Sequence, residues 1–273
     1  MILNQKLIDH DHWGDEFSIY CIGDVHLGNK VCDLAKLKRD VEFVKNEPLA
    51  YWIGMGDYIE AINYSDKRFD PTQISEKYLV ENLSNICKHQ FEDIMEIFSP
   101  IMHKCLGMHR GNHEESIRHY HHFDLMYEVK RDYPEIQMLE DTAFTRLTFR
   151  RHNHSVQTFI LWTAHGNVAG RKSGTKINRI EEAMGWFDAD VYILAHGHRK
   201  VFTSATQLGI KKAGKMFLRA KRRVGGMTGS YFKTYQEGTS TYGEKKMFSP
   251  SDLGCIKILI KPAHESFYLS EVN

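Results

Sequence analysis

Five short apolar runs in this sequence each end in a polar cluster that contains Asp, Asn or His. The runs span residues 17–22, 51–55, 105–108, 156–162 and 191–195, and their length and their β-branched and aromatic content predict buried strands. The polar residues that follow them are Asp24 and His26, then Asp57, then Asn112 and His113, then His165, and finally His196 and His198. Because ligands of α/β proteins bind at the carboxyl ends of strands, we expect these side chains to meet in one site.

Helical patterns between these runs place the chain in the α/β class. Asp33 is a suitable N-cap, and apolar residues recur after it at helical spacing as far as Val44, which predicts a βαβ unit with the next strand. Further helices are expected across residues 112–133 and from Ser173, as the N-cap, to Phe187. A β-hairpin is expected from 144–149 and 156–162, and later strands at 201–208, 215–224 and 255–260.

The length of 273 residues is compatible with one large domain, and we expect a single domain over residues 1–273. Residues 60–107 predict a helical insertion, and residues 199–273 predict a β-rich C-terminal part. Apolar side chains of the insertion, such as Phe91 and Phe98, belong either to the core or to a substrate cap, and their helical spacing favours the core. The glycine-rich stretch 225–229 lacks the lysine of a nucleotide-binding loop and predicts a tight turn.

Composition narrows the class of protein. Hydrophobic residues make up 42% of the chain and charged residues 26%, as is typical of soluble globular proteins. No apolar run approaches the roughly 20 residues of a membrane span and no signal pattern opens the chain, so we expect a cytoplasmic protein that does not bind membranes. The five cysteines are odd in number and never spaced as CxxC, which predicts reduced and mostly buried thiols.

The charge pattern leaves nucleic acid open as a partner. The net charge of +1 gives no global case for it, but nine Lys or Arg lie between Arg199 and Arg223 with Phe202 and Phe217 among them. Such a segment could follow a phosphate backbone while its rings stack on bases, and a solvated β-hairpin explains the pattern equally well. Histidines at positions 119, 121, 122, 152 and 154 are expected on the surface and outside the site.

The polar clusters supply seven candidate metal ligands: Asp24, His26, Asp57, Asn112, His165, His196 and His198. Two carboxylates, four imidazoles and one amide oxygen are too rich in nitrogen for calcium or a magnesium-only site and lack the thiolates of structural zinc. Manganese is therefore the leading expectation, with iron, zinc or magnesium as alternatives. Seven ligands exceed what one ion takes but suit two ions about 3.5 to 4 Å apart, with Asp57 as the candidate bridge.

This ligand set also predicts a chemistry. Two dications against two carboxylates leave about two positive charges, enough to hold a phosphoryl group and to ionise a bound water. The hydroxide formed in this way would attack phosphorus. We therefore expect a phosphoester substrate.

The motifs GDVH (23–26), GMGD (54–57), GNHE (111–114), AHG (164–166) and AHGH (195–198) together resemble the signature of the calcineurin-like metallophosphoesterases. Each motif alone is weak, but five in the correct order form a specific compound signal. The resemblance covers residues 17–198 and implies a four-layer α/β/β/α sandwich of two mixed β-sheets flanked by helices. It also implies one metal held by Asp24, His26, Asp57 and His198, and a second held by Asp57, Asn112, His165 and His196.

Three further residues are expected to be catalytic. His113 is similar to the family's non-ligating histidine, which protonates the leaving oxygen or stabilises phosphoryl charge, and Glu114 could hold it protonated. Arg110 matches an arginine that grips a phosphate oxygen in phosphoprotein phosphatases. Those phosphatases continue with Asp-Arg-Gly where this chain has Glu60, Ala61 and Ile62, which weakens the case for protein dephosphorylation.

The sequence thus predicts a metal-dependent phosphoester hydrolase. The leading interpretation is a phosphodiesterase that acts on nucleic acid or nucleotides by attack of metal-bound hydroxide, based on the basic segment and the missing phosphatase residues. One alternative is a phosphomonoesterase acting on small metabolites or phosphoproteins. An alternative of another class is a non-catalytic nucleic-acid-binding or assembly subunit, which is disfavoured because no predicted ligand is missing.

Overall fold

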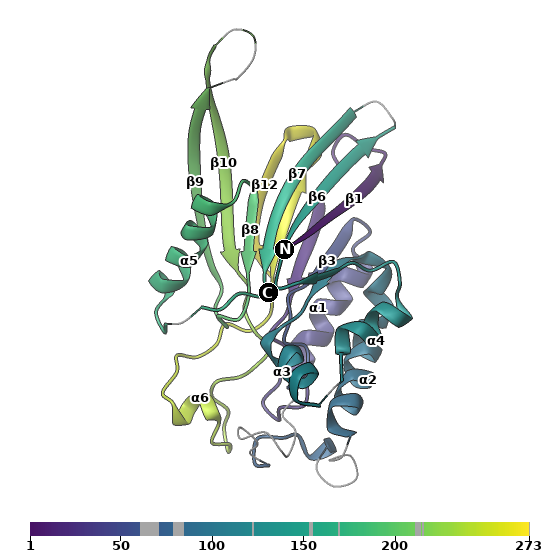
Figure 1. The fold of residues 1–273 in the computed structure, drawn as a ribbon, viewed down its shortest axis with the longest axis vertical. Helices are drawn as coiled ribbons and strands as arrows, with labels where there is room; N and C mark the ends of the chain where they lie inside the picture. The colour runs from purple at the N-terminus through teal and green to yellow at the C-terminus, as the bar shows by residue number, and fades with distance from the viewer. Residues whose placement is uncertain are drawn as a thin grey trace.

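The computed structural model describes residues 1–60, 71–78, 85–121, 123–152, 155–168, 170–210, 214 and 216–272. Its strands form two mixed six-stranded sheets (Figure 1). The first sheet has the order β1 (Ile2–His10), β6 (Thr142–Arg151), β7 (Ser155–Ala164), β8 (Val191–Leu194), β10 (Leu218–Met227) and β9 (Val201–Ile210). The second has the order β12 (Ser266–Glu271), β11 (Ile256–Lys261), β2 (Phe17–Ile22), β3 (Ala50–Gly54), β4 (Cys105–His109) and β5 (Met138–Glu140).

The two sheets pack face to face, and helices cover their outer faces. In β2, whose six residues are all buried, Phe17, Ile19 and Cys21 point into the core between the sheets. The alternate residues Tyr20 and Ile22 join the core beneath α1 (Leu34–Asn46), α2 (Ile86–Phe98), α3 (Asn112–His121) and α4 (Leu125–Asp132). The outer face of the first sheet packs on α5 (Ser173–Trp186). The predicted four-layer sandwich is therefore confirmed.

Parallel pairing brings the predicted ligands to one edge of the sandwich. Strand β3 pairs in parallel with β2 and with β4, and β8 pairs in parallel with β7. Parallel neighbours end at the same edge of their sheet, so the residues that follow them are neighbours in space. The short helix α6 (Tyr242–Lys245) is drawn at the lower left of Figure 1, and α3 is drawn to its right.

Several predicted elements are confirmed and others are corrected. Asp33 caps α1 as predicted, by accepting a hydrogen bond from the Lys36 amide. The single helix predicted over 112–133 is wrong, because Asp124 accepts hydrogen bonds from two amides at the start of α4 and so begins a second helix. Ser173 is the first residue of α5 and not its N-cap, which is Lys172, and this cap makes no side-chain hydrogen bond.

The tight turn predicted at residues 225–229 is also wrong. Gly225 and Gly226 lie inside β10, and a Cβ atom on Gly225 would lie 2.2 Å from Ile180 Cγ2. Glycine is therefore used here for the close approach of α5 to the sheet. The basic segment does form an antiparallel hairpin of β9 and β10, as expected.

Part of the predicted insertion at residues 60–107 lies outside the described residues, namely 61–70 and 79–84. Its described part contains the 3-10 turns Glu76–Tyr78 and Ser99–Lys104, helix α2, and the start of β4. Phe91 and Phe98 of α2 are buried in the core, as their spacing predicts. All five cysteines are free thiols and four are buried. Among the helices of the described residues, none has the length and apolar character needed to cross a bilayer.

Candidate metal centre

Five of the predicted ligands hold their backbone in the left-handed region. Their φ angles are 49° at Asp24, 52° at His26, 53° at Asp57, 65° at His196 and 49° at His198. This conformation costs a residue other than glycine roughly 1–2 kcal/mol, and such strain tends to cluster at functional sites. The tight turns after β2, β3 and β8 thus share one unusual geometry, and each carries predicted ligands.

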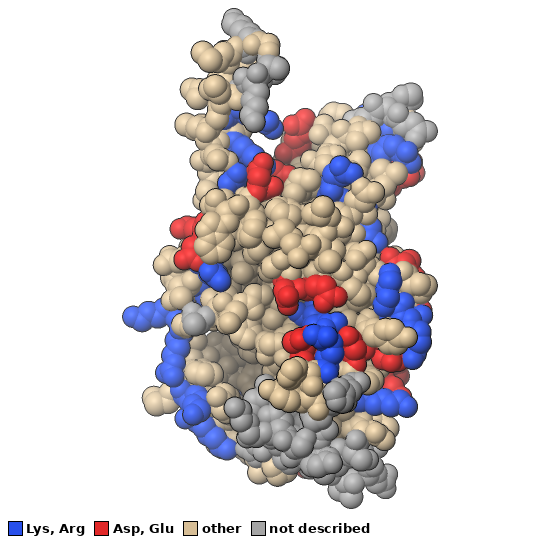
Figure 2. All heavy atoms as spheres, in the orientation of Figure 1, with Lys and Arg blue, Asp and Glu red and all other residues tan. Residues whose placement is uncertain are grey.

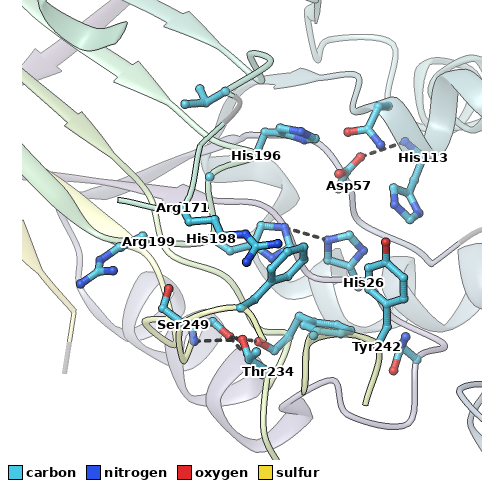
Figure 3. Close-up of a pocket in the computed structure, with 18 of the residues that line it drawn as sticks. His26, Asp57, His113, Arg171, His196, His198, Arg199, Thr234, Tyr242 and Ser249 are labelled. Atoms are coloured by element: carbon cyan, nitrogen blue, oxygen red, sulfur yellow. Dashed lines mark hydrogen bonds between the residues drawn. The ribbon is translucent and has the colours of Figure 1, made fainter. Parts of the chain in front are cut away.

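The first ligand group combines Asp24, His26 and His198, each of which offers a ligand atom within 4.8 Å of the other two. The Nε2 atoms of His26 and His198 face each other at 3.3 Å (Figure 3). Asp24 Oδ1 lies 3.6 Å from His198 Nε2. The other oxygen of Asp24 accepts a hydrogen bond of 2.8 Å from the His196 amide. These residues come from the turns after β2 and β8, so this group connects the two sheets.

The second group combines Asp57, His165 and His196, again within 4.8 Å of one another. His165 Nε2 lies 3.2 Å from Asp57 Oδ2 and 3.1 Å from the amide oxygen of Asn112. The structure therefore brings the seven predicted ligands together in two neighbouring groups. Participation of Asp57 in both groups, as a bridge, remains a prediction.

Hydrogen bonds behind two of the imidazoles direct their free nitrogens into the site. His165 donates through Nδ1 to the Met55 carbonyl at 2.7 Å, and His26 Nδ1 lies 3.1 Å from the carboxylate of Glu60. Such partners fix the ring orientation and leave Nε2 to serve as the ligand. Sequence reasoning noted Glu60 only as a departure from the phosphatase pattern and missed this function.

The electrostatics of the site favour positive charge. Burial lowers the pKa of His165, but the charge of Asp57 and their hydrogen bond outweigh it and raise that pKa to about 10. Burial raises the pKa of Asp57, but nearby histidines, first His165, hold it well below its usual range. A divalent cation at this site would be stabilised by the same negative charge, and it would displace the proton from His165.

Two buried polar atoms of the predicted ligands have no hydrogen-bond partner, as expected of atoms that bind a metal. Among the residues that the structure describes, Asp24 Oδ1 and His196 Nδ1 are buried and accept no hydrogen bond. An unsatisfied buried polar atom costs about 1–3 kcal/mol, so such atoms are rare without a reason. A carboxylate oxygen and an imidazole nitrogen are donors that manganese, iron and zinc accept. The residues present therefore fit divalent metal ions.

Glu114 anchors the Asp57 turn. Its carboxylate accepts hydrogen bonds from the amides of Asp57 at 2.9 Å, Tyr58 at 2.8 Å and Gly111 at 2.9 Å. A Cβ atom on Gly111 would lie 2.1 Å from Asp57 Oδ1, so only glycine allows this close approach. The geometry thus gives Glu114 a positioning role, and its predicted support of His113 remains a prediction.

The Arg110 guanidinium forms ion pairs with three carboxylates. Its guanidinium contacts Glu115 at 3.0 Å, Asp124 at 3.1 Å and Glu140 at 3.6 Å, and Arg110 does not line the cavity at the metal centre. This geometry does not support the predicted contact with a phosphate oxygen. It indicates that Arg110 joins α3, α4 and the end of β5.

His113 lies at the edge of the ligand groups. Its amide donates to Asp57 Oδ1 at 2.9 Å, and its Nδ1 donates to the carbonyl of Glu60. Burial lowers its pKa, but the charges of Asp57 and Glu60 outweigh that effect and raise it. The side chain lines the cavity beside the ligands, where its predicted contact with the leaving oxygen is geometrically possible.

The ligand groups open into one cavity of about 1000 Å³. Figure 2 shows this part of the surface as a hollow with Lys and Arg along one rim. Beyond the ligands, part of the lining comes from the segment that leads into α5 and from residues 232–251, and it includes Arg171, Lys176, Phe232, Tyr242 and Phe248. Sequence reasoning missed these residues, because no local pattern indicates that a distant loop folds against the site.

Two of the histidines expected on the surface can be placed in the described part of the chain. His119 and His152 are exposed, as expected, and neither lines the cavity. His122 and His154 lie outside the described residues. The motif histidines are therefore the metal-binding candidates in the described part of the chain.

No protein-family model and no curated protein matches this sequence. Among solved structures, Vps29 of Entamoeba histolytica complexed with zinc matches with a TM-score of 0.40 and 12% identity, over 94% of this chain and 98% of the other. The calcineurin-like phosphoesterase YfkN of Bacillus subtilis matches with a TM-score of 0.35 and 11% identity, over 83% and 92%. A metallophosphoesterase of Sphaerobacter thermophilus matches with a TM-score of 0.37 and 10% identity, over 94% and 90%.

All three matches have TM-scores below 0.5 and identities of 10–12%, so no family and no function of this chain follows from them. These likenesses are weak, and they concern the fold alone.

Proposed function

We propose that this protein is a hydrolase of phosphoesters that works with two divalent metal ions, manganese foremost. The convergence of seven oxygen and nitrogen donors in two groups is the observation that supports the proposal. When bound, such a pair of cations lowers the pKa of water and balances the charge of a phosphoryl group during in-line displacement.

The chain's own residues have distinct tasks in this proposal. Glu60 and the Met55 carbonyl orient His26 and His165, and Glu114 holds the turn that presents Asp57. His113 lines the cavity beside these groups, and neighbouring carboxylates raise its pKa, which suits a proton donor to the leaving oxygen.

We infer that the substrate is a phosphodiester of a nucleotide or nucleic acid. Arg110 is engaged by three carboxylates, so the arginine grip of phosphoprotein phosphatases lacks its counterpart here. The cavity continues beyond the ligands, which leaves room for a substituent on the side of phosphorus away from the leaving group. A phosphomonoesterase remains the competing assignment.

Turnover of bis-p-nitrophenyl phosphate and of p-nitrophenyl phosphate tests both parts of the proposal. The chelated protein should be inactive, and manganese should restore activity with a preference for the diester. Asp24→Asn should lower kcat/KM for the diester more than about 100-fold, beyond the loss typical of a residue that only supports a ligand. His152→Gln, on the exposed tip of the β6–β7 hairpin, is the matched control.

Each outcome has a clear meaning. A preference for the monoester would overturn the diester assignment and keep the hydrolase. No turnover with manganese, iron, zinc or magnesium, together with DNA or RNA binding that survives chelation, would instead favour a non-catalytic binding subunit.

A further inference from the structure

The cavity at the metal centre has a wall that supplies no metal ligand. We call Arg171, Lys176, Tyr242 and Phe248 the basic-aromatic wall. Arg171 and Lys176 line the cavity together with Arg199, whereas the lining carboxylates among the described residues are Asp57 and Glu60. Asp57 belongs to the predicted metal ligands, and the Glu60 carboxylate contacts His26. Neither carboxylate is therefore an ion-pair partner of Arg171 or Lys176 in the wall.

Arg171 and Lys176 are suited to an anion. No carboxylate of the described residues forms an ion pair with either side chain, and the Arg171 guanidinium lies 5.1 Å from the centre of the Phe248 ring. Lys176 is 5% exposed, and its ammonium donates to the Gly170 carbonyl at 3.2 Å. A buried ammonium and a guanidinium that both line a cavity and form no ion pair favour a bound anion there.

Arg199 also lines the cavity, but it has an acidic partner. Its guanidinium lies 3.8 Å from the carboxylate of Asp252, and in Figure 3 it points away from His26 and Asp57. Arg171 in the same view points toward His198. Arg171 and Lys176 are therefore the cations that we expect to bind the anion.

The aromatic part of the wall is open to a ligand. Tyr242 is 56% exposed and Phe248 38% exposed, and their ring centres lie 6.1 Å apart at 75°. Phe232 also lines the cavity, with its ring centre 5.8 Å from that of His26. Exposed rings that line a cavity provide a stacking surface for a planar group.

Hydrogen bonds hold the loop that carries these rings. Residues 234–251 are closed at their base by Thr234 and Ser251, whose hydroxyls lie 2.7 Å apart, and the Ser251 amide donates to Thr234 Oγ1 at 3.1 Å. Gln73 donates to the Ser240 carbonyl at 3.0 Å, and the Tyr235 hydroxyl donates to the Phe248 carbonyl at 2.8 Å. The wall is therefore preorganised, which lowers the entropic cost of binding.

We propose that the basic-aromatic wall binds a nucleoside that carries a second phosphoryl group beyond the scissile one. This inference rests on the proposed function. Arg171 and Lys176 hold the second phosphoryl group, and Tyr242 and Phe248 stack on the base. The substrate is then a nucleoside diphosphate derivative.

A small nucleotide explains the wall better than a nucleic-acid strand. The volume of about 1000 Å³ lies at the upper end for small-molecule sites, so a nucleotide with a substituent fits inside it. On the β9–β10 hairpin, Lys221 and Arg223 both pair with the carboxylate of Asp188, at 2.7 Å and 3.2 Å, so these two cations are not free to bind a nucleic-acid backbone. Inside the cavity, by contrast, Arg171 and Lys176 form no ion pair with a carboxylate of the described residues.

Binding of ADP and AMP to the manganese-loaded protein, measured by isothermal titration calorimetry, tests the inference. The wild type should bind ADP at least about tenfold more tightly than AMP, because the second phosphoryl group gains charge-assisted hydrogen bonds. Arg171→Met should remove this preference and Arg171→Lys should keep part of it. Arg150→Met removes an arginine that pairs with Asp9 outside the cavity, and this control should keep the wild-type ratio.

A second variant tests the stacking surface separately. Phe248→Ser should weaken ADP and AMP by the same factor and leave the affinity for inorganic pyrophosphate unchanged. Equal binding of ADP and AMP by the wild type, or an unchanged ratio in Arg171→Met, would overturn the inference. So would a DNA or RNA oligonucleotide that binds more tightly than ADP and does not respond to Arg171→Met.

Turnover of bis-p-nitrophenyl phosphate by the same preparation separates this inference from the proposed function. Turnover without a preference for ADP would refute the wall as a second-phosphate site and keep the hydrolase. A preference for ADP without turnover of any phosphoester would refute the hydrolase and keep the nucleotide site.

Discussion

Glu60 acts on the metal centre through His26. Its carboxylate lies 3.1 Å from His26 Nδ1 and accepts a second hydrogen bond of 3.1 Å from Asn29 Nδ2. Glu60→Leu should free the imidazole to rotate and lower manganese affinity about 10–100-fold, whereas Glu60→Gln keeps an acceptor and should lose less. Manganese titration by calorimetry measures both values, and wild-type affinity in Glu60→Leu would show that the carboxylate does not orient the ligand.

Glu114 should matter for stability. Glu114→Ala would leave the buried amides of Asp57, Tyr58 and Gly111 without their acceptor, and each unsatisfied amide costs about 1–3 kcal/mol. The free energy of unfolding in urea with a chelator should therefore fall by roughly 3 kcal/mol or more. Unchanged stability with a shifted pH–rate profile would instead support the role inferred from sequence, in which Glu114 keeps His113 protonated.

Arg110 joins three elements at the helical side of the sandwich. Arg110→Met would leave Glu115, Asp124 and Glu140 facing one another without a cation, and unfolding free energy should fall by about 2 kcal/mol, since the carboxylates are partly exposed. Arg118→Met, which removes an exposed arginine from the same Glu115, should have a much smaller effect. A wild-type unfolding curve combined with a large loss of kcat/KM would support the phosphate grip predicted from sequence.

His109 connects β4 to β5 and β7 and makes stability depend on pH. It is fully buried, its Nδ1 lies 2.7 Å from the Glu140 carbonyl and its Nε2 lies 2.7 Å from Thr163 Oγ1. Burial lowers its pKa from 6.5 to about 4. In the unfolded chain His109 becomes protonated as the pH falls below 6.5, whereas in the folded protein it becomes protonated only near pH 4. The folded state therefore loses stability as the pH falls through this range.

The comparison of wild type with His109→Gln isolates this contribution. Between pH 7 and pH 5, with a chelator present, the wild type should lose about 2 kcal/mol more unfolding free energy than the variant. Urea unfolding at the two pH values measures it. Equal losses in the two proteins would show that His109 does not titrate in this way.

Elements with a strong local pattern could be predicted from the sequence. The run 17–22 is wholly apolar apart from Ser18, and it becomes β2 in the centre of its sheet. Strand β1 was missed because Leu3 and Leu7 are exposed, so its alternation does not indicate a buried face. Gly225 in β10 was misread because its reason, the approach of α5, lies in tertiary packing.

The sandwich as a whole explains why the ligand set, but not the cavity wall, was predictable. Asp24, Asp57 and His196 follow strands whose ends the topology must bring together, and their side chains have the chemistry of metal ligands. Arg171 and Phe248 have no such signature, because their position depends on the hydrogen bonds that fold residues 234–251 over the site. The left-handed backbone at the ligands was likewise unpredictable, since it is imposed by the assembled turns.

Anomalous X-ray diffraction from crystals grown with manganese tests the central claim most directly. Two peaks should appear about 3.5 to 4 Å apart, one beside Asp24, His26 and His198, and the other beside Asn112, His165 and His196. Asp57 should contact both. A single peak, or none at these residues, would contradict the two-cation centre.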